Sequence, residues 1–261
     1  FAFASGKGGV GKTTLCVNLA LWVSLRKQKV LLVDGDLGMA DAHTLLGMNP
    51  QRNIASVLTS ENSLKDAVIP VHTNLHFISG GSGLSSLASL SPDRLMRLRD
   101  SLDTLPELYD AVFIDCAAGI GNSVLSWISG AHSLMLVVTP SATSLLDAYG
   151  LVKVCLERGF GGGVHVISNM ASSQAEAEMS FTNLNSCSIK FLKKELIYLG
   201  GIRKDQKIEK ALPQNNPIIP NKENSPALEN FSRIGEKILT LMTGGKKQDG
   251  IETGKYFCSK S

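Results

Sequence analysis

The 261-residue sequence contains no apolar run that approaches the ~20 residues of a membrane-spanning helix, and no secretory signal. Its five cysteines are odd in number, scattered along the chain and never arranged as C-x-x-C. These absences argue against a disulfide framework and against a local zinc or iron–sulfur site. We therefore expect a protein of a reducing compartment, the cytoplasm.

The chain also lacks a large excess of charge of either sign. The net charge is +3, and charged residues make up 19% of the chain against 43% hydrophobic residues. So small an excess does not predict nucleic-acid binding, and DNA is not expected as a partner. Since no internal repeat or linker divides the chain, we expect one domain over residues 1–243 and a polar, flexible tail over residues 244–261. The sequence begins inside a strand-like run without Met, which predicts further residues upstream.

Residues 5–14 read S-G-K-G-G-V-G-K-T-T and fit the phosphate-loop pattern G-x-x-x-x-G-K-[ST]. The apolar run 1–4 precedes them, and a helix-like stretch follows. Glycines permit backbone angles at which successive N–H groups point at phosphate oxygens, and the helix adds its positive N-terminal end. Lys12 is placed to reach the β- and γ-phosphates, and the Thr13 hydroxyl to ligate Mg²⁺. The predicted nucleotide-binding residues of the loop are Gly6, Lys7, Gly8, Gly9, Val10, Gly11, Lys12, Thr13 and Thr14.

Further apolar runs of strand length alternate with helical patterns. The runs cover residues 30–33, 75–78, 111–114, 134–138, 164–167 and 197–199. The helical patterns cover about residues 92–104, 122–130, 143–158, 174–187, 205–212 and 226–242. Strands that are apolar throughout are covered on both faces, so the alternation predicts an α/β fold with a doubly wound, mostly parallel sheet in three layers. In such sheets the ligand binds at the carboxyl ends of the strands.

Carboxylates stand at two of these strand ends. Asp115 fits a Walker B acid, whose carboxylate acts on Mg²⁺, usually through water. We assign Asp34 to Mg²⁺ and its waters, and Asp36 to holding the water that attacks the γ-phosphate. The predicted metal site therefore comprises Thr13, Asp34, Asp36 and Asp115. A carboxylate beside so much negative charge orients water better than it deprotonates it, which predicts slow hydrolysis.

Lys7 is a second lysine in the loop, additional to the Lys12 of the pattern. The sequence K-G-G-V-G-K-T-T resembles the deviant Walker A loop of the MinD/ParA family, P-loop NTPases of the SIMIBI class. Residues 32–40 look like the switch I region of this family, and residues 115–120 like its Walker B and switch II. The resemblance implies an ATP-sandwich homodimer in which Lys7 reaches the nucleotide of the second subunit. It makes Lys7, Lys12 and Asp36 the catalytic residues.

Other stretches resemble the flagellar branch of the family, the MinD-like regulators FlhG and FleN. They include residues 78–84, 137–140, 144–149 and 168–170. The resemblance implies a switch with weak Mg²⁺-dependent ATPase activity that controls flagellar number or placement. It also implies partners, namely the SRP-type GTPase FlhF, flagellar switch proteins or a transcription regulator. A peripheral contact with the inner face of the cell membrane is a further implication.

The same resemblance places the adenine near Asn169 and Asp205, and no N-K-x-D guanine motif is present, so ATP is favoured over GTP. An Asn at a strand end also caps loops, and that interpretation of Asn169 stays open. The apolar face over residues 231–242 stays open between core packing and a membrane contact.

Three rival functions are weighed against this one. A chromosome- or plasmid-partitioning ATPase, or a cell-division-site ATPase, belongs to the same family, and a partitioning ATPase predicts salt-sensitive DNA binding. An iron–sulfur carrier would use the C-x-x-C pair that the chain lacks. A small-molecule, ATP-dependent ligase-like enzyme needs a second substrate pocket with its own acid–base groups, and the sequence indicates none.

Overall fold

The computed structural model describes residues 1–37, 41–54, 64–81, 98, 108–205, 217, 219 and 225–248. Within these ranges the chain forms an eight-stranded sheet in the order β3-β4-β2-β5-β1-β6-β7-β8. All neighbouring strands run parallel except β3 and β4, which are antiparallel. The strands are β1 (Ala2–Ser5), β2 (Val30–Gly35), β3 (Ile69–His72), β4 (Leu75–Ile78), β5 (Ala111–Ala118), β6 (Ser133–Val138), β7 (Gly163–Ala171) and β8 (Ile197–Arg203).

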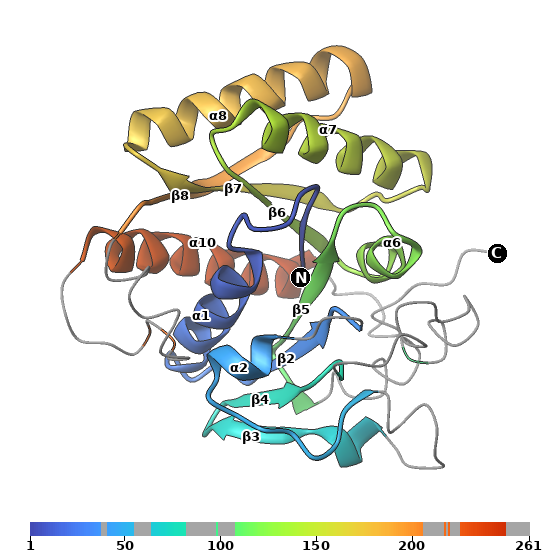
Figure 1. Ribbon diagram of the computed structural model, residues 1–261, viewed down its shortest axis with the longest axis vertical. Helices are drawn as coiled ribbons and strands as arrows, with labels where there is room; N and C mark the ends of the chain where they lie inside the picture. Colours follow the sequence, from blue (N-terminus) through green and yellow to red (C-terminus); the bar gives the residue numbers. More distant parts are fainter. Residues whose placement is uncertain are drawn as a thin grey trace.

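Helices cover both faces of this sheet (Figure 1). They are α1 (Lys12–Ser24), α2 (Ala42–Leu45), α6 (Asn122–Ser129), α7 (Ala142–Glu157), α8 (Gln174–Cys187) and α10 (Pro226–Gln248), with short helical turns at Leu64–Ala67 and Ser188–Leu192. Helices α1 and α10 pack on one face, and α6, α7 and α8 on the other. The expected three-layer, doubly wound fold is confirmed.

Alternate residues of a central strand enter the two layers of the core. In β2, Leu31 and Val33 join the apolar cluster beneath α6 and α7, whereas Val30 and Leu32 join the cluster beneath α1 and α10. All four side chains are fully buried. Because both faces of the strand are covered, every position needs an apolar residue, and the strand is a continuous apolar run in the sequence.

Helix α10 decides between the two interpretations of its apolar face. Phe231 and Ile234 are buried in the cluster that α1 shares, and Gly235 lets the Trp22 ring come so close that a Cβ would overlap it. This face therefore packs in the core. The helix continues to Gln248, beyond the expected end at residue 242, and residues 249–261 of the expected tail lie outside the described residues. No helix in the described ranges combines the length and apolarity needed to cross a membrane.

Sequence patterns miss β3, because it is a half-exposed edge strand that contains Pro70. They also end β5 and β8 too early, since both strands continue past their apolar runs, to Ala118 and Arg203. Several predicted segments lie outside the described residues. They are the helix at 92–104 apart from residue 98, most of the helix at 205–212, and residues 38–40 of the loop that resembles switch I.

Candidate phosphate-binding site

The phosphate loop joins β1 to α1 at the carboxyl edge of the sheet (Figure 1). Gly9 and Gly11 have φ angles of 76° and 81°, in the left-handed region that favours glycine. At Gly6 an added Cβ would overlap the backbone of Asp147 in the second turn of α7, and at Gly11 it would overlap the side-chain amide of Asn169. The glycines therefore let the loop turn and also let it contact α7 and β7 directly.

Lys12 lies on the inner side of this loop, paired with Asp115. The Lys12 Nζ is 2.6 Å from Asp115 Oδ1, and the two residues are 8% and 0% exposed. Burial lowers the pKa of Lys12, but the carboxylate of Asp115 outweighs burial, so the pKa of Lys12 is raised. Burial raises the pKa of Asp115, and the charge of Lys12 opposes that rise. Each partner thus compensates the charge of the other where water has little access.

Asp34 lies opposite Asp115 in the register of the neighbouring strands β2 and β5. It is fully buried, and burial together with the charge of Asp115 raises the pKa of Asp34 well above its ordinary value. Its Oδ1 accepts a hydrogen bond from the Asp36 N–H at 3.2 Å, and its Oδ2 accepts one from the Ala42 N–H at 3.1 Å. Asp34 thereby fixes both ends of the segment that follows β2, including Asp36.

Lys7 lies on the outer side of the loop and is exposed. Its Nζ donates a hydrogen bond to Thr143 Oγ1 at 3.3 Å, on the first turn of α7. Lys7 and Lys12 therefore contact different parts of the protein, although they belong to one short loop.

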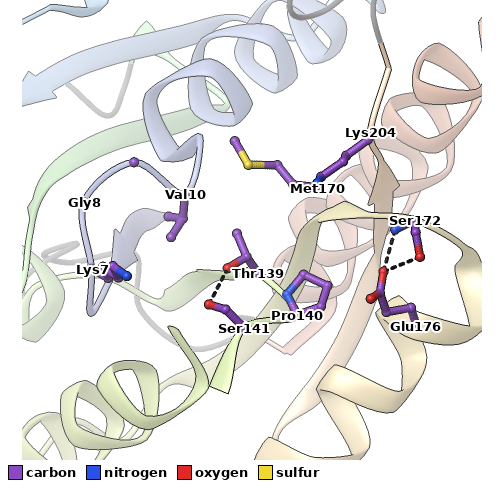
Figure 2. A pocket seen from close by; sticks show the side chains of 11 residues that line it. Lys7, Gly8, Val10, Thr139, Pro140, Ser141, Met170, Ser172, Glu176 and Lys204 are labelled. Carbon is purple, nitrogen blue, oxygen red and sulfur yellow. Dashed lines mark hydrogen bonds between the residues drawn. The ribbon is translucent and has the colours of Figure 1, made fainter. Parts of the chain in front are cut away.

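A cavity of about 520 Å³ opens beside Lys7, between the phosphate loop and the ends of β6, β7 and β8 (Figure 2). Its walls include Val10 from the loop, Pro140 after β6, Met170 on β7 and Lys204 after β8. The loop and the ends of three neighbouring strands thus surround a space large enough for a small ligand.

Asn169 and Asp205, the residues expected near adenine, stand at the ends of the adjacent strands β7 and β8. Asn169 is 6% exposed, and its Nδ2 donates to the carbonyl of Val10 at 2.8 Å. This contact braces the phosphate loop, and the contact of Asn169 with adenine stays a prediction. Asp205 is half-buried and follows the last residue of β8 by two positions.

Three residues of the site were not predicted from the sequence as part of it. Thr143 binds Lys7, and Met170 lines the cavity with an unusual φ of 57°. Trp127 is buried, and its Nε1 donates to the carbonyl of Gly35 at 3.1 Å. Each contact joins segments far apart in the chain, and the sequence carries no local pattern that marks them.

A glycine loop between a strand and a helix, with a lysine–carboxylate pair beneath it, defines a P-loop nucleotide-binding protein when it lies at the carboxyl edge of a doubly wound sheet. The comparisons with known proteins agree. A family model described as an AAA domain matches residues 1–155. Antiactivator FleN of Pseudomonas aeruginosa is 34% identical over 238 residues, which cover 91% of this chain and 85% of FleN.

Two further proteins are similar to this chain over most of its length. Flagellum site-determining protein YlxH of Helicobacter pylori is 27% identical and covers 93% of this chain and 83% of its own length. The crystal structure of the cell division ATPase MinD of Pyrococcus furiosus matches with a TM-score of 0.78 at 25% identity, over 92% of this chain and 98% of that one. The chain therefore belongs to the MinD/ParA family of P-loop ATPases, as its loop predicted, and it is an ATP-binding ATPase.

Proposed function

We propose that this ATPase is a dimerising switch, in which ATP joins two copies of the chain and slow, Mg²⁺-dependent hydrolysis separates them. The observation that carries the proposal is the opposite placement of the two loop lysines. Lys12 is buried against Asp115, whereas Lys7 is exposed and rests on Thr143 of α7. A cation on the outer side of its own loop is available to phosphates that a second copy binds.

The inner side of the loop holds the triphosphate in this proposal. Lys12 exchanges the Asp115 carboxylate for oxygens of the β- and γ-phosphates, and the first turn of α1 adds its positive end. Asp115 is then left without its cationic partner at the place where a metal ion is expected. In this proposal the Lys12–Asp115 pair compensates both charges before ATP binds.

The residues beside Lys12 fit Mg²⁺. Asp115 Oδ2 is buried and accepts no hydrogen bond within the described part of the chain, and Thr13 stands next to Lys12 at the start of α1. Mg²⁺ prefers oxygen ligands, keeps several waters and commonly takes only one or two carboxylates. It therefore does not require a cluster of three or more His, Cys, Asp or Glu side chains, and the described ranges contain none. Thr13 and Asp115, with Asp34 behind them, would hold the ion, which neutralises phosphate charge when bound.

Asp36 orients the attacking water in this proposal. Its backbone N–H is held by Asp34 at the end of β2, so the side chain leaves the sheet at a fixed point. A carboxylate close to the γ-phosphate meets like charge and is a poor base there, which keeps turnover slow. The dimer is favoured while the triphosphate is intact, because a ligand that binds the dimer more tightly than the monomer shifts the equilibrium toward the dimer.

We further propose a role in setting flagellar number or placement, acting with a flagellar protein partner such as FlhF, a switch protein or a transcription regulator. The relative YlxH supports this role, since it is a flagellum site-determining protein, and the identity with FleN agrees with the flagellar branch that the sequence resembles. A division-site or partitioning role is the alternative within the family. The cysteine pattern supports the cytoplasm as the compartment. A peripheral membrane contact, which the resemblance implies, would have to use a surface other than the buried apolar face of α10.

Asp36→Ala tests the switch. We expect the variant to bind ATP and dimerise but to hydrolyse ATP about a hundredfold more slowly, so that the ATP-bound dimer accumulates. Phosphate release and sedimentation velocity measure the two effects. Glu157→Ala, which removes an exposed carboxylate at the far end of α7, is the control. Parental hydrolysis by the Asp36 variant, or a monomer at saturating ATP, overturns the proposal.

A further inference from the structure

The peptide group between Gly35 and Asp36 is clamped at both of its ends. Its N–H belongs to Asp36 and donates to Asp34 Oδ1 at 3.2 Å. Its carbonyl belongs to Gly35 and accepts from Trp127 Nε1 at 3.1 Å, in a buried hydrogen bond between β2 and α6. Because the Asp36 Cα is attached to this peptide, the plane of the peptide decides where the Asp36 side chain begins.

The approach of Trp127 depends on glycine at position 35. A Cβ there would lie 2.8 Å from Trp127 Nε1 and 3.0 Å from Ile114 Cγ2, closer than ordinary packing permits. Trp127 itself is 2% exposed, so its N–H has little access to water as a substitute partner. The indole therefore holds the carbonyl in a contact that packing on both sides enforces.

Helix α6 connects this contact to the rest of the site. It begins at Asn122, just after the turn that follows β5, the strand that carries Asp115. In that turn the Gly119 N–H donates to the carbonyl of Ser5 at 2.9 Å, where the phosphate loop starts. Trp127 thus links the segment bearing Asp36 to a helix that is anchored beside Asp115 and the phosphate loop.

We propose that Trp127 is a positioning residue for ATP hydrolysis. Its indole N–H fixes the Gly35–Asp36 peptide and, through that peptide, the carboxylate that orients the attacking water. The inference rests on the role proposed for Asp36, and Trp127 acts only through the backbone. A misplacement of about 1 Å can cost about a hundredfold in rate. Since Asp34 still holds the N–H when Trp127 is changed, we expect a smaller loss, about tenfold.

Trp127→Phe keeps an aromatic ring in the core and removes the N–H. We expect kcat for ATP hydrolysis to fall about tenfold, while KM for ATP and ATP-induced dimerisation stay within about twofold of the parent. Trp22→Phe is the matched control. Trp22 is also 2% exposed and its Nε1 donates at 3.1 Å to Ser232 Oγ, but it lies between α1 and α10. Equal loss of kcat in both variants, or a parental kcat for Trp127→Phe, overturns the inference.

A double variant separates this inference from the proposed function. If Trp127 acts through Asp36, Asp36→Ala combined with Trp127→Phe hydrolyses ATP at the rate of Asp36→Ala alone. If Asp36→Ala is slow and the double variant is a further tenfold slower, Asp36 keeps its role and the inference about Trp127 is wrong. If Asp36→Ala hydrolyses ATP at the parental rate, the proposed role of Asp36 is wrong, and the inference about Trp127 is overturned with it.

Fluorescence gives a readout that does not depend on the folding of Trp127→Phe. The chain has two tryptophans, so the Trp22→Phe protein reports Trp127 alone. We expect the emission of Trp127 to change when ATP and Mg²⁺ bind, because its indole N–H is hydrogen-bonded to the segment that carries Asp36. Emission that stays constant at saturating nucleotide contradicts the coupling.

Discussion

The two lysines of the phosphate loop occupy opposite environments. Lys12 is almost fully buried and is held at 2.6 Å by the carboxylate of Asp115, a charged pair closed to water. Lys7 is exposed and held at 3.3 Å by the neutral hydroxyl of Thr143. A long hydrogen bond in water contributes little, so Lys7 can leave its partner at low cost, whereas Lys12 can leave only when another anion replaces Asp115.

The difference teaches that position in the loop, and not residue type, decides what each lysine can do. The inner side carries Lys12 and Asp115, which are partnered within the protein and which we propose separate when phosphate binds. The outer side carries Lys7, an exposed cation beside an open cavity of about 520 Å³. Substitutions on the two sides should therefore separate ATP binding from dimerisation.

The largest expected effect comes from breaking the inner pair. Lys12→Ala removes the ammonium that contacts phosphate and should weaken ATP binding about a hundredfold or more, by calorimetric titration. It also leaves Asp115 buried without its partner, so the free energy of unfolding of the nucleotide-free protein should fall by about 3 kcal/mol in urea titrations. An ATP affinity close to that of the parent contradicts the inner assignment.

On the outer side, Lys7→Ala should abolish ATP-induced dimerisation while the monomer binds ATP within about threefold of the parent. The free energy of unfolding should change by less than about 0.5 kcal/mol, because the side chain is exposed and its one hydrogen bond is long. Sedimentation velocity and nucleotide titration measure the two effects. The control is Lys153→Ala, which removes an exposed lysine of α7 away from the loop and should leave ATP-induced dimerisation normal. Loss of ATP binding by the Lys7 monomer would place this lysine on the inner side instead.

Asn169→Ala sharpens the comparison by loosening the loop without changing charge. Losing the bond to the Val10 carbonyl should weaken ATP binding about tenfold and lower the free energy of unfolding by about 1 kcal/mol. Titrations with ATP and GTP distinguish the two interpretations of Asn169. An equal loss for both nucleotides supports bracing of the loop, and a change in their ratio supports a contact with the base.

The smallest effect is a change in pH dependence on the inner side. The pKa of Asp34 in the folded protein is raised by burial and by Asp115, so the folded state keeps a proton that the unfolded chain has lost. The contribution of Asp34 to the free energy of unfolding should therefore be fully present below its unfolded pKa, about 4. This contribution should fall as the pH rises toward the raised pKa of Asp34 in the folded protein. Asp34→Asn cannot titrate and should flatten this fall, with Asp115 leaving a residual slope. Urea titrations from acid to neutral pH that show equal slopes contradict this.

Much of the fold could be predicted because its signals are local. The loop at residues 5–14, the apolar run at 30–33 and the helix at 174–187 each carry their pattern within one segment, and the structure places a loop, a strand and a helix there. The edge strand β3 carries no such pattern, since Pro70 and half-exposed residues break it.

The contacts of the site could not be predicted, because they depend on how distant segments pack. Asn169 and Val10 are 159 positions apart, and Trp127 and Gly35 are 92 positions apart. The Lys12–Asp115 pair requires β1 and β5 to be neighbours in the sheet, which no single segment of the sequence reveals. Residue types at strand ends indicate that a site exists, but only the packing shows which groups hold one another.

The central claim is that ATP joins two copies through the outer side of the loop. Sedimentation equilibrium of the parent protein with a non-hydrolysable ATP analogue and Mg²⁺ tests it most directly. The account predicts twice the chain mass of 27.9 kDa with the analogue, and the single chain mass with ADP or without nucleotide. A parent protein that saturates with the analogue and still sediments at 27.9 kDa contradicts it.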